Sequence, residues 1–182
     1  MATTEHITTA DELLAAGDIG PCELVRGQLA MVSPSGGEHG RVVARLTVRL
    51  ANHVEQHGCG IVLGAETGFR IHTEPDTVRA SDVAFIRAQR AAIARTSGFI
   101  QGPPDLAVEV ISLGDRTAEV RAKATQWIET GCAEVWIVDP ETHTVAVHSA
   151  GAPPRVHSAG EVLTGGAVVR GFKVEVADIF GK

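Results

Sequence analysis

Apolar residues recur at helical spacing over two long segments of the chain. In residues 38–57 they stand about 3.6 positions apart, at Val42, Val43, Leu46, Leu50 and Val54. Gly58 follows as a stop signal, which predicts an amphipathic helix. Residues 117–130 predict a second helix, with Val120, Ala124 and Trp127 on one side. A short helix is expected over residues 9–16, capped by Thr9.

Strand patterns fill most of the remaining chain. Residues 22–32 predict a hairpin that turns at Arg26 and Gly27. Further strands are expected at residues 60–64, 68–72, 82–87, 104–112, 134–140 and 142–149, and one or two more before a short terminal turn. The alternation in residues 142–149 is typical of a strand at an exposed edge. Residues 88–97 are expected to be helical or irregular.

The order of these elements predicts an α/β fold with a central mixed β-sheet flanked by helices. No long linker and no internal repeat interrupts the sequence, so we expect a single domain over residues 1–182.

Composition and charge narrow the classes of protein. Hydrophobic residues make up 44% of the chain, yet no apolar run is long enough for a transmembrane helix and no basic, apolar secretory signal opens it. A cytoplasmic protein without a membrane partner is expected. Cys22, Cys59 and Cys132 are far apart, which argues against a disulfide framework or a cysteine zinc site. The net charge of −6 argues against non-specific coating of nucleic acid, but it permits a local basic groove.

One charged residue interrupts the apolar strand PDLAVEVIS. Glu109 needs a cation or donors there, because burying a lone carboxylate costs several kcal/mol or more. Asp82 opens another apolar strand, DVAFI. If the two strands are neighbours, their carboxylates converge where a divalent cation would offset the repulsion. Lys123, beside the apolar stripe of its helix, could turn toward the same point.

These residues lie within a longer resemblance. The segments ELVRGQLAMVSPSGGEHGRVVARL, SDVAFI, PPDLAVEVIS, DRTAEVRAKATQWIETG and EVWIVDPETHTVAVH resemble the Uma-type family two of restriction endonucleases, in the PD-(D/E)XK superfamily. The resemblance implies a restriction-endonuclease-like fold. It also implies that Asp82 and Glu109 are the acidic metal ligands and that Lys123 is the catalytic lysine, moved from strand to helix.

Two residues depart from the superfamily pattern. Ser81 replaces the usual proline, which shapes the strand rather than binding metal. Ile111 stands where the pattern has lysine, so the triad depends on whether Lys123 reaches the site.

Three further residues are accessory candidates. His39 matches a histidine often found in the family, and it either approaches the metal site or caps and packs locally. Glu38 is either the accessory acidic residue of the first core helix or a solvated first-turn glutamate. Glu66 either projects toward Asp82 or is solvated at a strand edge.

Other patterns have simpler interpretations. His53 and His57 lack the glutamate of HExxH, so a solvated face is favoured over zinc. Arg41, Arg45 and Arg49 form a basic line, which is either a solvent face or a contact for a DNA backbone. An exposed Glu119 and Lys123 pair would be the simplest alternative role of that lysine.

The sequence therefore predicts a Mg²⁺- or Mn²⁺-dependent endonuclease that hydrolyses DNA. The alternative is a non-catalytic binding or assembly protein that retains the nuclease fold. A homodimer is expected, because two related sites cut a duplex most simply and the exposed strand 142–149 could pair across an interface.

Overall fold

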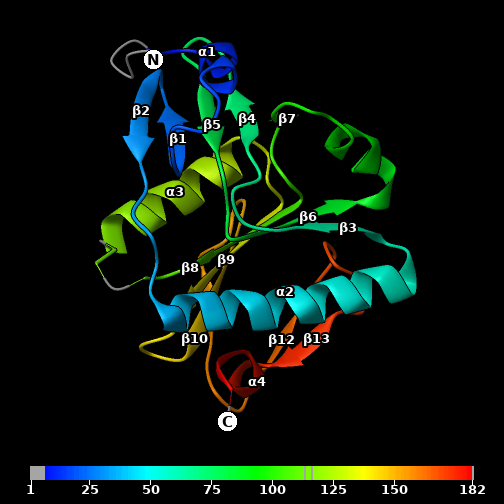
Figure 1. Cartoon of the computed structure of the whole chain (residues 1–182). Helices are drawn as coiled ribbons and strands as arrows, with labels where there is room; N and C mark the ends of the chain where they lie inside the picture. Colours follow the sequence, from blue (N-terminus) through cyan, green and yellow to red (C-terminus); the bar gives the residue numbers. More distant parts are fainter. Residues whose placement is uncertain (1–6, 113, 116, 182) are drawn as a thin grey trace.

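The computed structural model describes residues 7–112, 114–115 and 117–181 (Figure 1). The ends of the expected domain, residues 1–6 and 182, lie outside this description. The helices are α1 (Ala10–Ala15), α2 (Gly37–His57), the 3-10 helix η2 (Ala88–Ala94), α3 (Thr117–Glu129) and α4 (Val176–Phe180). The strands are β1 (Cys22–Val25), β2 (Gln28–Met31), β3 (Gly60–Leu63), β4 (Phe69–His72), β5 (Thr77–Arg79), β6 (Val83–Arg87), β7 (Ile100–Gln101), β8 (Leu106–Val110), β9 (Glu134–Asp139), β10 (Thr144–Ser149), β11 (Arg155–His157), β12 (Val162–Thr164) and β13 (Lys173–Glu175).

Within the described residues, the largest sheet is mixed and six-stranded, in the order β11-β10-β9-β8-β6-β3. Its neighbours β8 and β9 are parallel, and the other neighbouring pairs are antiparallel. The central strands β6, β8 and β9 are almost wholly buried, because their side chains are apolar on both faces. The predicted α/β class with a central mixed sheet is confirmed.

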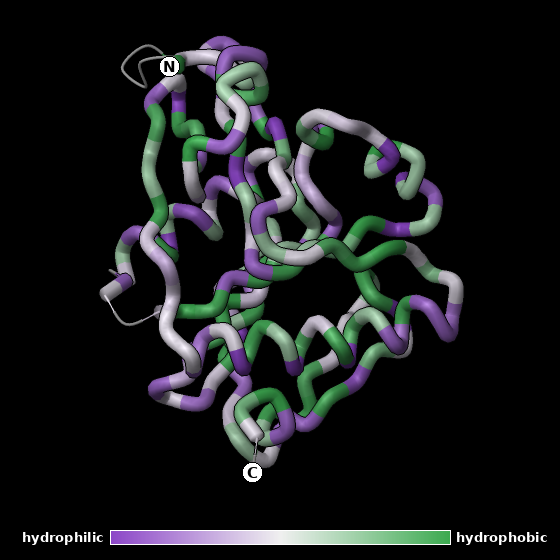
Figure 2. Tube along the Cα trace, viewed as in Figure 1, coloured by the Kyte–Doolittle hydropathy of each residue, from purple (hydrophilic) through white to green (hydrophobic). Residues whose placement is uncertain are grey.

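The two long helices cover opposite faces of this sheet. The buried residues of α2 pack with Val83, Phe85 and Val108, whereas α3 packs with the alternate residues Ala84 and Ala107. Successive side chains of a strand point to opposite faces, so α2 and α3 lie on different sides (Figure 1). Figure 2 shows the hydrophobic residues concentrated along the central strands between them.

The predicted helix boundaries hold closely. Thr9 accepts a hydrogen bond from the backbone N–H of Glu12, whose side chain accepts one in return from the N–H of Thr9, which forms a capping box at α1. Gly58 ends α2 in the left-handed conformation that favours glycine.

A second sheet contains the N-terminal hairpin, in the order β2-β1-β5-β4-β7. Arg26 and Gly27 both have positive φ, 51° and 71°, as a two-residue hairpin turn requires. The predicted hairpin is therefore confirmed. In this sheet β5 was not predicted, and neither was β7, because runs of three and two residues carry too little periodicity.

The expected exposed edge at residues 142–149 is wrong. In the structure β10 pairs with β9 on one side and with β11 on the other, so β11 forms this edge of the large sheet. The preceding Pro153 and Pro154 hid β11, because proline interrupts a strand pattern.

Candidate active site

The two predicted carboxylates lie close together at one end of the β6–β8 pair. The regular antiparallel register of β6 and β8 ends at Val83 and Val108. Beyond it, the N–H of Asp82 donates to the carbonyl of Val108 at 3.0 Å, one residue out of that register. The side chain of Asp82 in turn accepts from the N–H of Val110, the residue after Glu109. Glu109, in line with Ala107, points to the face that α3 covers.

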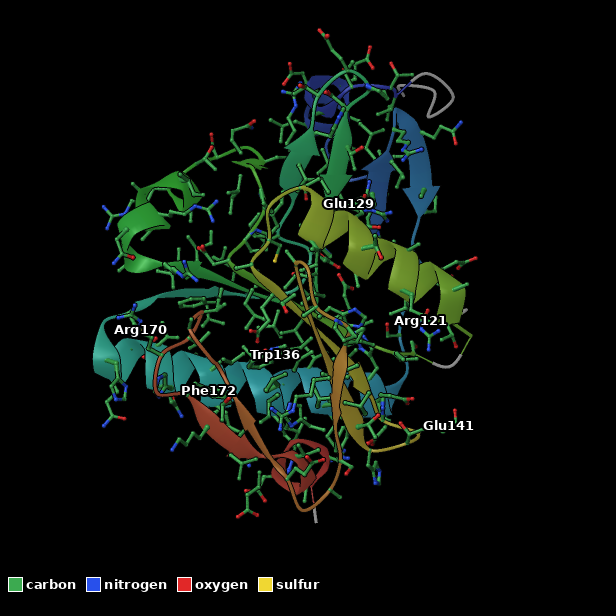
Figure 3. All side chains as sticks on the ribbon, turned by 180° about the vertical axis from the view of Figure 1, so that it is seen from behind. Arg121, Glu129, Trp136, Glu141, Arg170 and Phe172 are labelled. Carbon is green, nitrogen blue, oxygen red and sulfur yellow. The ribbon has the colours of Figure 1, made fainter. Side chains whose placement is uncertain are left out.

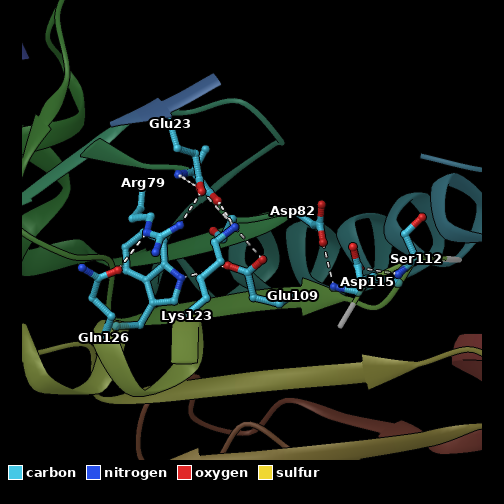
Figure 4. Close-up of polar contacts among 12 residues, drawn as sticks. Glu23, Arg79, Asp82, Glu109, Ser112, Asp115, Lys123 and Gln126 are labelled. Carbon is cyan, nitrogen blue, oxygen red and sulfur yellow. Dashed lines mark hydrogen bonds and ion pairs between the residues drawn. The ribbon is translucent and has the colours of Figure 1, made fainter. Parts of the chain in front are cut away.

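Glu109 is buried, with 7% of its surface exposed. Its Oε1 accepts a hydrogen bond from the indole Nε1 of Trp127 at 2.8 Å, and its Oε2 lies 2.9 Å from Nζ of Lys123 (Figure 4). Burial raises the pKa of Glu109 to about 7, against the opposing effect of Lys123. An indole and an ammonium are therefore the partners that this mid-strand carboxylate needs.

Lys123 reaches the sheet from the middle of α3. Its ammonium donates to the carbonyl of Ala80 at 2.8 Å and lies 3.1 Å from Oε1 of Glu23 and 2.9 Å from Oε2 of Glu109. Burial alone would lower the pKa of Lys123, but the two carboxylates raise it above its ordinary value. The lysine is thus charged and held between two acidic side chains.

Asp82 and His39 meet at the edge of the cluster. Oδ2 of Asp82 accepts a hydrogen bond from the N–H of Val110 at 2.7 Å and lies 3.3 Å from Nε2 of His39. The hydrogen bond to Asp82 raises the pKa of His39, although burial opposes it. His39 stands in the first turn of α2, so this helix brings a group from the other side of the sheet to the strand end.

The remaining accessory candidates differ in position. Glu38 lies on the exposed side of α2 and pairs with Arg41, with 2.6 Å between Oε1 and Nη2. This pairing matches the interpretation of Glu38 as a solvated first-turn residue. Glu66, in the left-handed conformation with φ of 67°, lines the same cavity as Asp82.

That cavity has a volume of about 500 Å³ and opens beside the cluster. Its polar walls include Glu23, His39, Glu66, Asp82 and Lys123. A larger cavity of about 760 Å³ lies between α3 and strands β9 to β11, on the side seen in Figure 3, where Arg121 and Glu129 of α3 are labelled. None of the predicted site residues lines it.

The basic line of α2 faces the C-terminal segment. A guanidinium nitrogen of Arg41 donates to the carbonyl of Phe180, and Gly181 packs against Arg41 and Arg45. Both arginines therefore make contacts within the chain, and their use in DNA binding, with Arg49, stays a prediction. The predicted solvated face of His53 and His57 is also partly packed, because Nε2 of His53 bonds the carbonyl of Arg170 at 2.9 Å.

Sequence reasoning missed Glu23 and Arg79. Oε2 of Glu23 accepts from Nη1 of Arg79 at 2.6 Å, and Oε1 accepts from the N–H of Ala80 at 3.0 Å (Figure 4). Burial alone would raise the pKa of Glu23, but Lys123 and Arg79 lower it below its ordinary value. The available signal was an acidic residue between Cys22 and Leu24, of the same kind that marks Glu109.

The donor set suits a hard divalent cation. Within the residues that the structure describes, no three His, Cys, Asp or Glu side chains form a ready metal cage. Mg²⁺ does not need one, because it is commonly bound through one or two carboxylates and keeps several waters. Asp82 and Glu109 supply two carboxylates at the same end of β6 and β8, near enough for the charge of Asp82 to raise the pKa of Glu109, so the residues fit such an ion.

The fold is shared with a known structure. The chain has a TM-score of 0.81 to the crystal structure of "a putative nuclease belonging to DUF820" from Anabaena variabilis, at 18% identity over 94% of this chain and 97% of that one. The two chains therefore share one fold.

A family model, Uma2, described as "putative restriction endonuclease", matches residues 10–177. The chain belongs to this family, as the resemblance of its motifs predicted. No curated protein matches the chain. Among the helices of the described residues, none combines the length and apolar character that crossing a membrane requires.

Proposed function

We propose that the protein is a divalent-metal-dependent endonuclease that hydrolyses phosphodiester bonds of DNA, with Mg²⁺ or Mn²⁺ as the cofactor. The observation that carries the proposal is the meeting of Asp82, Glu109 and Lys123, which come from three separate elements. Family membership and the nuclease fold support the class of reaction. The cavity beside Asp82 supplies access for a phosphate.

Each residue has a distinct role in this proposal. Asp82 and Glu109 would hold the cation, which when bound polarises a phosphoryl oxygen and lowers the pKa of water. Lys123 orients the attacking water and stabilises the negative charge that grows on the phosphate. His39 fixes the carboxylate of Asp82 through their 3.3 Å contact.

The test is cleavage of supercoiled plasmid DNA in Mg²⁺ or Mn²⁺. Wild type is expected to nick the plasmid, and a chelator is expected to stop it. Glu109→Gln keeps the volume of the side chain but removes its charge, so we expect a folded, inactive variant. Glu55→Gln, an exposed position on α2, is the matched control and should cleave like wild type. Cleavage by Glu109→Gln at the wild-type rate would contradict the assignment of Glu109.

A second candidate function is a binding or assembly protein that retains the nuclease fold. It is favoured by the burial of Glu109, both of whose oxygens are engaged within the chain, and by the net charge of −6. A well-folded wild type that neither binds Mn²⁺ nor nicks plasmid, single-stranded or branched DNA would support it over the nuclease.

The expected homodimer and the cytoplasmic location stay part of the proposal. Because β10 is covered, pairing between subunits at this edge of the large sheet would use β11. Light scattering during size-exclusion chromatography gives the mass, and a monomer at working concentrations would contradict the dimer.

A further inference from the structure

Glu23 belongs to the N-terminal hairpin, yet its carboxylate is held inside the site. Strand β1 pairs with β5 at Leu24 and Val78, which brings Glu23 beside Arg79 and Ala80. Only 8% of its surface is exposed. Both carboxylate oxygens are engaged, so its position is fixed independently of Glu109.

The anchor of Glu23 extends to the helix that carries the lysine. Nε of Arg79 donates to Oε1 of Gln126 at 2.8 Å, and Gln126 stands three residues after Lys123 on α3. The hairpin, β5 and α3 are therefore joined around one carboxylate (Figure 4). Arg79 thus donates through separate nitrogens to Glu23 and to Gln126, and these charge-assisted hydrogen bonds restrict the geometry of all three side chains.

The ammonium of Lys123 can donate three hydrogen bonds, and three acceptors surround it. They are the carbonyl of Ala80 and the carboxylates of Glu23 and Glu109, at 2.8, 3.1 and 2.9 Å. If Glu109 turns its oxygen toward a cation, one N–H of Lys123 becomes available for water or phosphate. Two contacts then still hold the ammonium, and Glu23 provides the only negative charge among them.

We propose that Glu23 is a positioning residue, which holds the ammonium of Lys123 in place when Glu109 is engaged elsewhere. Its use in catalysis rests on the proposed nuclease function, but the holding of Lys123 does not. With Glu109 turned away and Glu23 absent, the partly buried ammonium of Lys123 would have only the carbonyl of Ala80 as a protein partner, and a desolvated charge without a counter-ion is disfavoured. The N-terminal hairpin is thus part of the site.

The sequence offers a direct probe, since lysine occurs only at Lys123, Lys173 and Lys182. With ¹⁵N-lysine labelling, the ammonium of Lys123 is expected to give a ¹H–¹⁵N signal protected from solvent exchange, assigned by its absence in Lys123→Arg. In Glu109→Leu, which removes the other carboxylate, the signal should persist at pH 7. Adding Glu23→Gln to Glu109→Leu should accelerate the exchange of the Lys123 ammonium protons with solvent at least about tenfold, because the last charged acceptor is lost.

Loss of the signal in Glu109→Leu alone would overturn the proposal, and so would its persistence in the double variant. The pair Glu109→Gln and Glu109→Gln/Glu23→Gln repeats the comparison with the volume at residue 109 unchanged, should the leucine variant not fold. Glu55→Gln, in place of Glu23→Gln, is the control and should leave the exchange rate unchanged. None of these measurements needs metal or DNA.

In the cleavage assay, Glu23→Gln should lower kcat about 10- to 100-fold while KM for DNA changes less than about twofold, since a group acting on the transition state affects kcat. An unchanged kcat would overturn the catalytic part of the proposal. A wild type that cleaves no DNA would instead refute the nuclease function, and the exchange measurement would still decide whether Glu23 holds Lys123.

Discussion

Replacing Glu109 by glutamine should change how the stability of the protein depends on pH. The pKa of Glu109 is about 7 in the folded protein and 4.5 ordinarily, because burial disfavours the charge more than Lys123 favours it. A difference of one pKa unit corresponds to 1.36 kcal/mol, so ionising this carboxyl costs about 3 kcal/mol more in the folded protein than in the unfolded chain.

The free energy of unfolding falls with rising pH, because the folded protein binds the proton of Glu109 more tightly than the unfolded chain does. Between the ordinary pKa and about 7, the folded protein retains a proton that the unfolded chain releases, so wild type loses stability as pH rises through this range. About 2.5 kcal/mol of the loss develops between pH 5 and pH 8. Glu109→Gln cannot ionise and lacks this contribution. The free energy of unfolding of the variant minus that of wild type should therefore increase by about 2.5 kcal/mol over the same range.

Urea unfolding followed by circular dichroism at several pH values measures this difference. The control Glu55→Gln, at an exposed position, should differ from wild type by a constant amount. If the difference in free energy of unfolding between Glu109→Gln and wild type stays constant with pH, the raised pKa is contradicted, because Glu109 would then ionise at its ordinary pKa. A difference that decreases with pH would show that Lys123 outweighs burial.

Three further substitutions test separate contacts. Lys123→Met leaves the buried carboxylate of Glu109 without its cation, so it should abolish DNA cleavage and, at pH 8, lower the free energy of unfolding by about 3–5 kcal/mol, whereas the exposed control Lys173→Met should change neither. Trp127→Phe removes the indole N–H that binds Glu109 and should cost about 1–3 kcal/mol in urea unfolding; a smaller loss would contradict the importance of this bond. Asp76 is buried, but hydrogen bonds from the N–H of Ala10 and from the guanidinium of Arg70 lower its pKa. Wild type should therefore lose free energy of unfolding as acid protonates Asp76, and Asp76→Asn should lack this dependence in unfolding measured from pH 6 to pH 3.

Periodicity predicted the elements that bury large apolar faces. The four buried residues of α2 recur at helical spacing, and the turn at Arg26 and Gly27 separates two alternating runs. It failed for β5 and β7, which are too short to show a period. It also misplaced β10 at the edge, because the partner strand β11 is recognisable only once its pairing is seen.

The site was predictable where a charge breaks an apolar strand. Asp82 and Glu109 stood out for that reason, and Lys123 stood out because the family resemblance assigned it a role. Glu23 did not, since a polar residue in an alternating hairpin is usually solvated. It is buried because β1 pairs with β5, whose Arg79 and Ala80 bind the carboxylate, and because Lys123 reaches it from α3; these contacts form only in the folded chain.

Calorimetric titration of Mn²⁺ into wild type and Glu109→Gln measures whether Asp82 and Glu109 bind metal. We expect saturable binding by wild type and a loss of that binding in the folded variant. Equal binding by both proteins, or none by a folded wild type, would contradict a metal-dependent nuclease site at Asp82 and Glu109.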